Sequence, residues 1–471
     1  MAKAIMIQGT MSSAGKSYIV TGLCRHYMRQ GLSVAPFKSQ NMALNSYITA
    51  DGLEMGRAQV VQAMACGKEP SVYMNPILLK PTTDVGSQVI VEGRPIGNMR
   101  AAEYYKFKTS LIPNIRHAYD MLSADNDLII IEGAGSPAEI NLRDNDIVNM
   151  GLAEMLNVPV LLVGDIDPGG VFAQLAGTIS LLTEPERDRV KGLIINKFRG
   201  DVGLLKPGLE SLEHICGKPV VGVVPMSQVR LEEEDSITSA FANSTTSEAR
   251  MDIAVIRLPR ISNFTDFNAL QIIPGVQVRY VLRPSELGSP DMIILPGTKA
   301  TIADLRWLKE TGLADCIRGM AREIPVLGIC GGYQMLGQLI EDPDNVEGGG
   351  CEKGLGLLAV TTRLSLEKTT RQVEIEIGNA DGYFSFLNGL TCSGYEIHNG
   401  LTESAEGESN PNCYGTYIHG FFDRAEIAQA IVGQAGQARD YSAYRQDQFN
   451  ALADSLEESL NFELIDRIIG L

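Results

Sequence analysis

The N-terminal sequence Ala4-Ile-Met-Ile-Gln-Gly-Thr-Met-Ser-Ser-Ala-Gly-Lys-Ser17 joins a short apolar run to a glycine-rich turn. When Gly-Lys-Ser follows a strand and opens a helix, backbone N–H groups and the helix dipole point toward bound phosphates. We therefore expect ATP at this loop, with Lys16 countering phosphate charge and the Ser17 hydroxyl available to Mg²⁺. The candidate ATP-binding residues of the loop are Gly9, Thr10, Gly15, Lys16 and Ser17. A chance Gly-Lys-Ser is the alternative, and the flanking strand and helix argue against it.

Around this loop the first half of the chain alternates apolar strands with helical stretches. Several strands are continuous Ile, Leu and Val runs, typical of a parallel sheet covered on both faces. We expect strands at residues 4–8, 33–37, 128–132, 158–164, 192–196 and 220–224, and helices at 15–30, 171–182 and 204–216. The pattern predicts a doubly wound α/β domain with ligands beyond the carboxyl ends of its strands.

Five residues separate Gly9 from Gly15, one more than in the usual P-loop. This longer loop resembles that of dethiobiotin-synthetase-type enzymes, which activate a carboxylate-like group by phosphoryl transfer. Such chemistry needs acidic metal ligands, and Glu132 ends the strand Leu128-Ile-Ile-Ile-Glu132 just before glycines. The expected Mg²⁺ ligands are thus Ser17, Glu132 and, in a loop of undefined structure, Asp51. Glu132 could instead be a helix cap or turn residue, and Asp51 a turn aspartate before Gly52.

A second α/β pattern begins at Met251 and carries the run Gly328-Ile-Cys-Gly-Gly332. Strands are expected at 253–258, 276–281, 292–295, 326–329, 372–377, 394–398 and 414–419, with a helix from Gly331. Small residues around Cys330 allow a sharp strand-to-helix turn that exposes the sulfur, and the helix N-terminus favours a thiolate. Cys330 is therefore the candidate nucleophile, whereas the other seven cysteines are expected to be buried structural residues. The oxyanion donors are expected to be the N–H of Gly331 and one from the turn at Gly297.

The thiolate needs a base, and the chain has only five histidines. His26, His117 and His214 lie in helical segments of the first half and are expected at the surface or in packing. His398 and His419 remain, in Gly394-Tyr-Glu-Ile-His-Asn-Gly400 and Tyr414-Gly-Thr-Tyr-Ile-His-Gly420.

Composition and charge limit the class of protein. With 471 residues the chain is too long for one ordinary core, so two domains are expected. A net charge of −17 argues against a nucleic-acid partner, because no basic field exists to hold phosphate backbones. The sequence shows no secretory signal and no apolar run long enough for a bilayer, so we expect a cytoplasmic protein without a membrane partner.

The expected division is an ATP-dependent amide synthetase domain over 1–229, a linker over 230–250, a glutamine amidotransferase domain over 251–445, and a packing helix over 446–471. In the last of these, Phe449, Leu452, Leu456, Leu460, Leu464 and Ile468 share one helix face. A thiol able to attack an amide, fused to a loop able to hold ATP, indicates a glutamine- and ATP-dependent amide synthetase.

With both sites in this order, the chain resembles the cobyric acid synthase family, glutamine-dependent amidotransferases of cobalamin biosynthesis. The resemblance covers essentially the whole chain and is carried by segments such as Pro36-Phe-Lys-Ser-Gln-Asn-Met42, Asp51-Gly-Leu-Glu-Met-Gly-Arg-Ala-Gln59 and Asn75-Pro-Ile-Leu-Leu-Lys-Pro81. It implies an N-terminal dethiobiotin-synthetase-like P-loop domain and a C-terminal class I glutamine amidotransferase-like domain. The implied reaction amidates the b, d, e and g side-chain carboxylates of (adenosyl)cobyrinic acid a,c-diamide, giving (adenosyl)cobyric acid. Its cofactors would be ATP and Mg²⁺, its partners glutamine and a corrinoid, and a homo-oligomer is left open.

The resemblance also assigns roles to residues. It implies His419 as the base, with His398 on the substrate side or structural, and Asn196 where related enzymes contact the nucleotide base. Class I amidotransferases carry His-x-Glu, whereas this chain has Phe421 in place of the Glu, so either a Cys–His dyad or a replacement partner must serve. The substrate-side candidates are Lys38, Gln40, Asn41, Glu54, Arg57 and Gln59, each of which could instead be an ordinary polar residue of a loop or helix.

Two alternatives stay open. Cobyrinic acid a,c-diamide synthases share both modules in the same order, but the segments at 36–42 and 51–59 favour the cobyric acid synthase family. A P-loop scaffold ATPase with an inert glutaminase-like domain is the other alternative. Such ATPases usually carry a lysine early in the loop, whereas this chain has Thr10-Met11 there.

Overall fold

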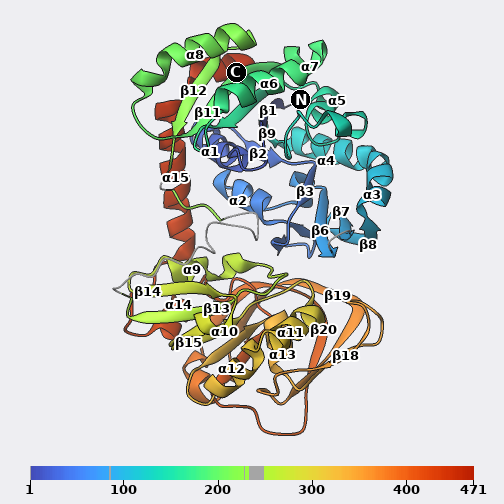
Figure 1. Ribbon diagram of the computed structural model, residues 1–471, viewed down its shortest axis with the longest axis vertical. Coiled ribbons are helices and arrows are strands. Elements are labelled where there is room, and N and C mark those ends of the chain that lie inside the picture. The colour runs from blue at the N-terminus through green and yellow to red at the C-terminus, as the bar shows by residue number, and fades with distance from the viewer. Residues whose placement is uncertain (1, 84–85, 228, 233–248) are drawn as a thin grey trace. The chain divides into compact units, whose positions relative to one another are not determined.

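The computed structural model describes residues 2–83, 86–227, 229–232 and 249–471 (Figure 1). The chain divides into two compact units. The first consists of Met1–Met42, Met55–Leu231 and Arg445–Leu471, and the second of Ala43–Glu54 and Glu232–Tyr444. The linker expected over 230–250 lies largely outside the described residues. Two segments group away from their neighbours in sequence: Ala43–Glu54 joins the second unit, and the C-terminal tail joins the first.

The first unit is built on a six-stranded parallel sheet with the order β12-β11-β10-β1-β9-β2. Consecutive residues Ile5, Met6 and Ile7 are all fully buried, which requires cover on both faces and confirms the predicted doubly wound domain. The strands are β1 (Lys3–Gly9), β2 (Val34–Phe37), β9 (Leu128–Glu132), β10 (Val160–Asp165), β11 (Val190–Phe198) and β12 (Val220–Pro225). The helices are α1 (Lys16–Arg29), α2 (Arg57–Ala65), α3 (Ala101–Phe107), α4 (Ile112–Asp125), α5 (Met150–Leu156), α6 (Val171–Leu181), α7 (Glu184–Arg189) and α8 (Val202–Cys216).

The register of this sheet gathers its polar residues at one edge. Glu132 pairs with Ile7, Gly9 with Val163, and Asp165 with Asn196. The P-loop, Glu132, Asp165 and Asn196 therefore all follow the carboxyl ends of neighbouring strands. A smaller sheet of β3 (Gln40–Met42), β6 (Ile77–Thr83), β7 (Gly86–Val91) and β8 (Arg94–Arg100) completes the unit.

The C-terminal tail forms two helices where the sequence predicted one. The long red helix of Figure 1, α15 (Tyr441–Ser459), ends before Leu460, and α16 (Phe462–Ile469) starts from Asn461, whose side chain accepts the N–H of Leu464 at 3.0 Å. Phe449, Leu452, Leu456 and Leu460, which the sequence placed on one packing face, enter the core of the first unit. The break shifts the buried face, so that Ile465 and Ile469 are buried, whereas Leu464 and Ile468 are only partly covered.

The second unit contains a five-stranded parallel sheet with the order β14-β13-β15-β16-β21. Its strands are β13 (Met251–Ile256), β14 (Val276–Val281), β15 (Met292–Leu295), β16 (Val326–Ile329) and β21 (Cys413–Thr416). The helices are α9 (Asn268–Gln271), α10 (Pro284–Leu287), α11 (Thr301–Glu310), α12 (Leu313–Met320), α13 (Gly331–Leu336) and α14 (Ala425–Val432). The strand expected at 414–419 ends at Thr416, so His419 lies in the loop beyond it.

Beside this sheet, β18 (Gly350–Lys353), β17 (Leu339–Asp342), β19 (Val360–Glu376) and β20 (Thr391–Ser404) form a second one in that order. The strands expected at 372–377 and 394–398 are parts of the much longer β19 and β20. Within the described ranges, no helix combines the length and the apolar character needed to cross a bilayer.

Candidate functional sites

The P-loop wraps its lysine in backbone carbonyls. Lys16 is almost fully buried, and its Nζ donates to the carbonyl oxygens of Met11 and Ser12 at 3.0 Å and of Gly135 at 3.2 Å. Gly15 adopts φ +95°, and a Cβ there would lie 2.0 Å from Asn196 Nδ2. Glycine is required at this position on both grounds. Asn196 in turn donates to the Ala14 carbonyl at 3.0 Å, so its amide fixes the loop from the end of β11.

Glu132 is the centre of a buried polar cluster behind the loop. Its Oε1 accepts from Ser17 Oγ at 2.8 Å and from Lys38 Nζ at 2.9 Å, and its Oε2 accepts from Gln62 Nε2 at 2.5 Å. Burial raises the pKa of Glu132, but the charge of Lys38 and these three hydrogen bonds outweigh it and hold the pKa below its ordinary value. The cluster therefore presents an ionised carboxylate next to a hydroxyl. The contacts of Gln62 were not foreseen from the sequence.

These oxygens suit Mg²⁺, which prefers hard oxygen donors and usually keeps waters and phosphate oxygens in its shell. Ser17 and Glu132 are brought together, whereas Asp51 belongs to the second unit, where Thr49 donates to its carboxylate. Among the described residues, no group of three or more His, Cys, Asp and Glu side chains forms a metal-binding set. The role of Asp51 as a ligand stays a prediction.

The substrate-side candidates divide between the two units. Lys38 joins the Glu132 cluster, Asn41 donates to Gln59 at 3.0 Å, and Gln40 accepts from Tyr104 at 2.6 Å. Arg57 opens α2 and is buried. Glu54 belongs to the second unit, where it pairs with Lys368 at 2.5 Å.

A further ion pair supports the loop from β10 and β11. Lys197 Nζ lies 2.7 Å from Asp165 Oδ2 and donates to the Ser13 carbonyl at 2.8 Å. Asp165 ends its strand, in Gly164-Asp-Ile-Asp-Pro168, which was the available signal for a functional position.

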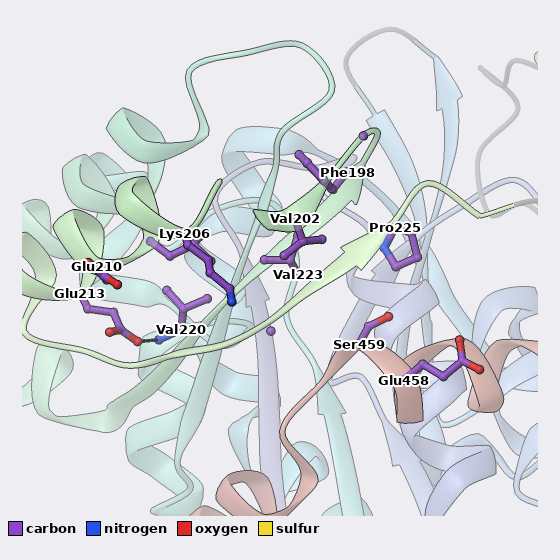
Figure 2. A pocket seen from close by; sticks show the side chains of 13 residues that line it. Phe198, Val202, Lys206, Glu210, Glu213, Val220, Val223, Pro225, Glu458 and Ser459 are labelled. Carbon is purple, nitrogen blue, oxygen red and sulfur yellow. Dashed lines mark hydrogen bonds between the residues drawn. The ribbon is translucent and has the colours of Figure 1, made fainter. Parts of the chain in front are cut away.

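A cavity of about 750 Å³ opens beside the edge strand β12, between α8 and the end of α15 (Figure 2). Its charged lining residues come from α8 and α15, and Glu213 accepts the backbone N–H of Val220 at 2.7 Å. None of its lining residues belongs to the Glu132 cluster. The lining residue nearest in sequence to Asn196 is Phe198, two residues later. The phosphate-directed groups of this unit thus lie outside it.

In the second unit, Cys330 occupies a strained elbow. It has φ +51° and ψ −110°, a backbone conformation that is rare for a residue with a Cβ and that persists where surrounding packing enforces it. A Cβ on Gly332 would lie 2.0 Å from the Leu295 carbonyl oxygen, so glycine is required for α13 to approach β15. The sulfur lies 3.6 Å from the Ile397 carbonyl oxygen. The predicted strand–nucleophile–helix geometry is therefore present.

Asp266 stands in the place of the missing carboxylate. Its Oδ2 lies 2.7 Å from His419 Nδ1, and its Oδ1 accepts the N–H of Gly420 at 3.0 Å. Burial lowers the pKa of His419, but the Asp266 carboxylate and then the Cys330 side chain outweigh burial and raise the pKa to about 10. Cys330, His419 and Asp266 thus lie together in the arrangement of a triad, and Asp266 is the candidate for the replacement partner. Asp266 is 153 residues from His419, and no spacing rule could have identified it.

The oxyanion candidates lie beside this triad. A Cβ on Gly297 would lie 3.0 Å from His419 Cε1, and one on Gly331 would lie 3.2 Å from the Thr298 nitrogen. The turn after β15 therefore reaches both the nucleophile and the base. The Thr298 amide joins Gly331 and Gly297 as a candidate donor that the sequence did not single out.

His398 lies in a network around Gln334. Its ring stacks on Tyr417 with centroids 3.8 Å apart, and its Nδ1 lies 2.8 Å from the Gly400 carbonyl oxygen. Gln334, one helical turn after Cys330, donates to Tyr417 Oη at 3.2 Å and accepts from Thr301 at 3.1 Å. Burial raises the pKa of Tyr417 to about 12, so its hydroxyl keeps its proton at physiological pH. His398 is therefore held in this network, whereas the histidine in contact with Cys330 is His419.

The remaining cysteines and histidines take mostly structural positions. Cys24, Cys66, Cys216, Cys392 and Cys413 are buried as expected. Cys316 is half-buried and Cys351 exposed, so the expectation of burial was wrong for these two. His26 packs on Phe462, with ring centroids 3.8 Å apart, and pairs with Glu457 at 2.8 Å.

Comparison with known proteins follows the same division of the chain. Residues 5–237 match the family model of the CobQ/CobB/MinD/ParA nucleotide binding domain, and residues 252–427 match that of the CobB/CobQ-like glutamine amidotransferase domain. The cobyric acid synthase of Ruminiclostridium cellulolyticum is 54% identical over 100% of this chain and 97% of its own length. Those of Lachnoclostridium phytofermentans and Salmonella arizonae are 53% and 47% identical, over 100% of this chain and 99% of theirs. Among solved structures, the match to PurLQS from Thermotoga maritima covers 43% of this chain and 99% of that chain, with 18% identity and a TM-score of 0.28.

Proposed function

The chain belongs to the cobyric acid synthase family of glutamine-hydrolysing amidotransferases, and on that premise we propose how its residues carry out the amidation. The substrate is (adenosyl)cobyrinic acid a,c-diamide, whose b, d, e and g carboxylates become amides to give (adenosyl)cobyric acid. The observation that supports this proposal best is the triad of Cys330, His419 and Asp266 on the same chain as the Glu132 cluster and its P-loop.

Glutamine hydrolysis would proceed through a covalent thioester. The Cys330 thiolate attacks the side-chain amide carbon, and N–H groups near Gly331 and Gly297 stabilise the oxyanion. His419, protonated at neutral pH because of Asp266, donates a proton to the departing ammonia. The neutral imidazole then takes a proton from water, which cleaves the γ-glutamyl thioester and releases glutamate.

The first unit would activate the acceptor. A corrinoid carboxylate attacks the γ-phosphorus of ATP, ADP leaves, and an acyl phosphate forms, which ammonia then converts to the amide with loss of phosphate. Lys16 and the loop amides hold the phosphates, and Lys38 balances the charge of Glu132. Mg²⁺, held by Ser17 and Glu132, would neutralise charge on the transferring group. Asp51 is proposed as a further ligand, and Asn196 as a contact for the nucleotide.

The test is mass spectrometry of the corrinoid formed with ATP, Mg²⁺ and glutamine. We expect the a,c-diamide to gain amides at its remaining propionate side chains. Consumption of unamidated cobyrinic acid would instead assign the chain to the a,c-diamide synthase reaction. A parent enzyme that does not hydrolyse glutamine would contradict the proposal altogether.

A cytoplasmic location also remains a prediction, which cell fractionation would check.

A further inference from the structure

A twelve-residue stretch from the ATP-binding half of the sequence belongs to the glutaminase unit. Ala43–Glu54 groups with Glu232–Tyr444, although the residues on both sides of it belong to the first unit. The stretch, called here the inserted segment, contains β4 (Ser46–Ile48) and ends at Glu54, the first residue of β5 (Glu54–Gly56). Ser46 and Ile48 are fully buried, so the segment is packed and is not a surface loop.

On one side the inserted segment holds the turn that carries Asp266. The backbone N–H of Ser46 donates to Asn263 Oδ1 at 3.0 Å. Asn263 has φ +51° and starts the short 3-10 turn Phe264–Phe267, and its carbonyl accepts the N–H of Asp266 at 3.0 Å. The conformation that places Asp266 is therefore tied to the Ser46 backbone.

On the other side the segment holds the residue that packs on His419. The carbonyl of the same Ser46 accepts from Tyr395 Oη at 2.9 Å. Tyr395 exchanges two backbone hydrogen bonds with His419, at 2.9 and 3.1 Å, and its ring stacks on the imidazole with centroids 5.4 Å apart. Ser46 thus contacts Asn263, which begins the turn of Asp266, and also Tyr395, which packs on His419.

Three more contacts fix the segment to β19. Thr370 Oγ1 donates to the Gly52 carbonyl at 2.8 Å, Gln372 donates to the Ile48 carbonyl, and the Lys368–Glu54 pair at 2.5 Å is buried. Ile48 also packs in one apolar cluster with Tyr395 and Ile397. These anchors hold the part of the segment that follows Ser46 against β19, and a positioning element requires such support.

We propose that the inserted segment positions the catalytic pair His419–Asp266, with Tyr395 and Asn263 as the positioning residues through which it acts. Glutamine hydrolysis then depends on residues that the ATP-binding half of the sequence supplies. The segment is continuous at Met42 with the substrate-side candidates Gln40 and Asn41, and it carries Asp51. The inference rests on the proposed function, because it requires a glutaminase at Cys330.

The test compares two variants with matched controls in the full-length enzyme. Tyr395→Phe keeps the ring over His419 and removes the bond to Ser46, and Thr370→Val removes the bond to Gly52. The controls are Tyr383→Phe, at a tyrosine of the same unit with an exposed fraction of 43%, and Thr311→Val, whose hydroxyl donates to carbonyls of its own helix. Glutaminase kcat and KM are measured without nucleotide, per Cys330 titrated by a diazoketone analogue of glutamine.

For Tyr395→Phe we expect kcat to fall about tenfold with KM within about twofold, the rate equivalent of one buried hydrogen bond. Thr370→Val should lower kcat severalfold in the same sense, and both controls should match the parent. Synthesis from ammonium ions should be unchanged in Tyr395→Phe and in both controls. A lower melting temperature with an unaltered kcat per titrated site would show a merely structural role and overturn the inference.

The proposed function fails independently of this inference if Cys330→Ala retains glutaminase activity. Hydrogen exchange provides a readout besides activity. In Thr370→Val, amides of the Asp266 turn and of the Tyr395 region should exchange faster than in the Thr311→Val control. Unchanged exchange at both places would also count against a positioning role.

Discussion

At the scale of single residues, the chemistry of each site depends on a charged partner that is buried with it. His419 keeps its proton because Asp266 lies 2.7 Å away, and Glu132 keeps its charge because Lys38 lies 2.9 Å away. In both cases desolvation by burial acts against the direction of the pKa shift, and the charged partner is the stronger influence. Removing such a partner alters the protonation of the reacting group as well as its position.

We predict that Asp266→Asn lowers glutaminase kcat at least about a hundredfold, because the imidazole loses both its orienting carboxylate and the charge that stabilises its protonated form. The pKa of His419, about 10 in the parent, should fall once this raising influence is gone. The alkaline decline of glutaminase kcat/KM, which follows loss of the imidazolium proton, should therefore move to lower pH. Glutamate release measured across a pH series checks both effects.

Asp315→Asn, at an exposed carboxylate of the same unit, is the control and should leave the profile in place. A variant at position 266 with the parental pH profile would show that His419 does not depend on this carboxylate.

At the scale of elements, close approach of α13 to β15 builds the nucleophile elbow. The contact requires a glycine at 332, because any side chain would meet the backbone of Leu295. The glycines around Cys330 predicted this sharp turn, although the backbone that Gly332 meets belongs to a strand distant in the sequence.

We predict that Gly332→Ala destabilises the second unit by about 2–4 kcal/mol or prevents its folding, as expected for overpacking against backbone. Gly319→Ala in α12 is the matched control, since nothing lies within 4 Å of its Cβ. That change should be neutral or stabilising by about 0.5–1 kcal/mol, the difference in helix propensity. The chain has a single tryptophan, Trp307 in α11, so its fluorescence during urea unfolding reports on this unit.

The tail helix α15 contributes a face to the core of the first unit. Leu456 is fully buried there, and a Cβ on Gly22 of α1 would lie 2.3 Å from its Cδ1. The two helices therefore approach closely at Gly22, and the contact leaves no space for a larger side chain at that position.

We predict that Leu456→Ala destabilises the first unit by about 2–5 kcal/mol, the range for a buried leucine replaced by alanine. Leu204→Ala, at an 84% exposed leucine of α8, should change stability by less than about 0.5 kcal/mol. Circular dichroism melting and the thermal half-life of ammonium-dependent amidation measure the effect. Equal stabilities for the two variants would contradict the assigned packing of the tail.

At the scale of the whole molecule, the two chemistries reside in different units of one chain. The triad lies entirely in the second unit and the Ser17–Glu132–Lys38 cluster entirely in the first. Each should therefore be removable without loss of the other.

We predict that Cys330→Ala abolishes glutamine-dependent amidation and retains synthesis from ammonium ions. Glu132→Gln should do the reverse, losing amidation at least about a hundredfold with either nitrogen source and retaining basal glutaminase. Parallel assays of glutamate release and corrinoid amidation on the two variants check the prediction. Loss of ammonium-dependent synthesis in Cys330→Ala would show that the thiol has a second role.

The sequence predicted most of the parallel strands and both glycine turns, because each has a recognisable pattern of residue types close together in the chain. The strand at 128–132 and the elbow at Cys330 were placed correctly for this reason. The end of β21 was not, since Ile418 and His419 read as a continuation of an apolar strand, whereas the strand ends at Thr416 and His419 forms a bridge with Tyr395 of β20. The single tail helix was likewise wrong, because the cap at Asn461 resets the phase of the buried face.

By itself the sequence determined the two doubly wound domains, the phosphate loop, the nucleophile and the family, since backbone sterics and local hydrophobic patterns carry that information. Tertiary structure alone decided that Asp266 completes the triad, that Gln62 and Lys38 hold Glu132, and that residues 43–54 belong to the glutaminase unit. The physical reason is that a hydrogen bond between distant segments leaves no periodic trace in either. A buried charge or amide without a partner is costly, so the groups that are buried together must pair. Which groups are buried together is a property of the folded chain.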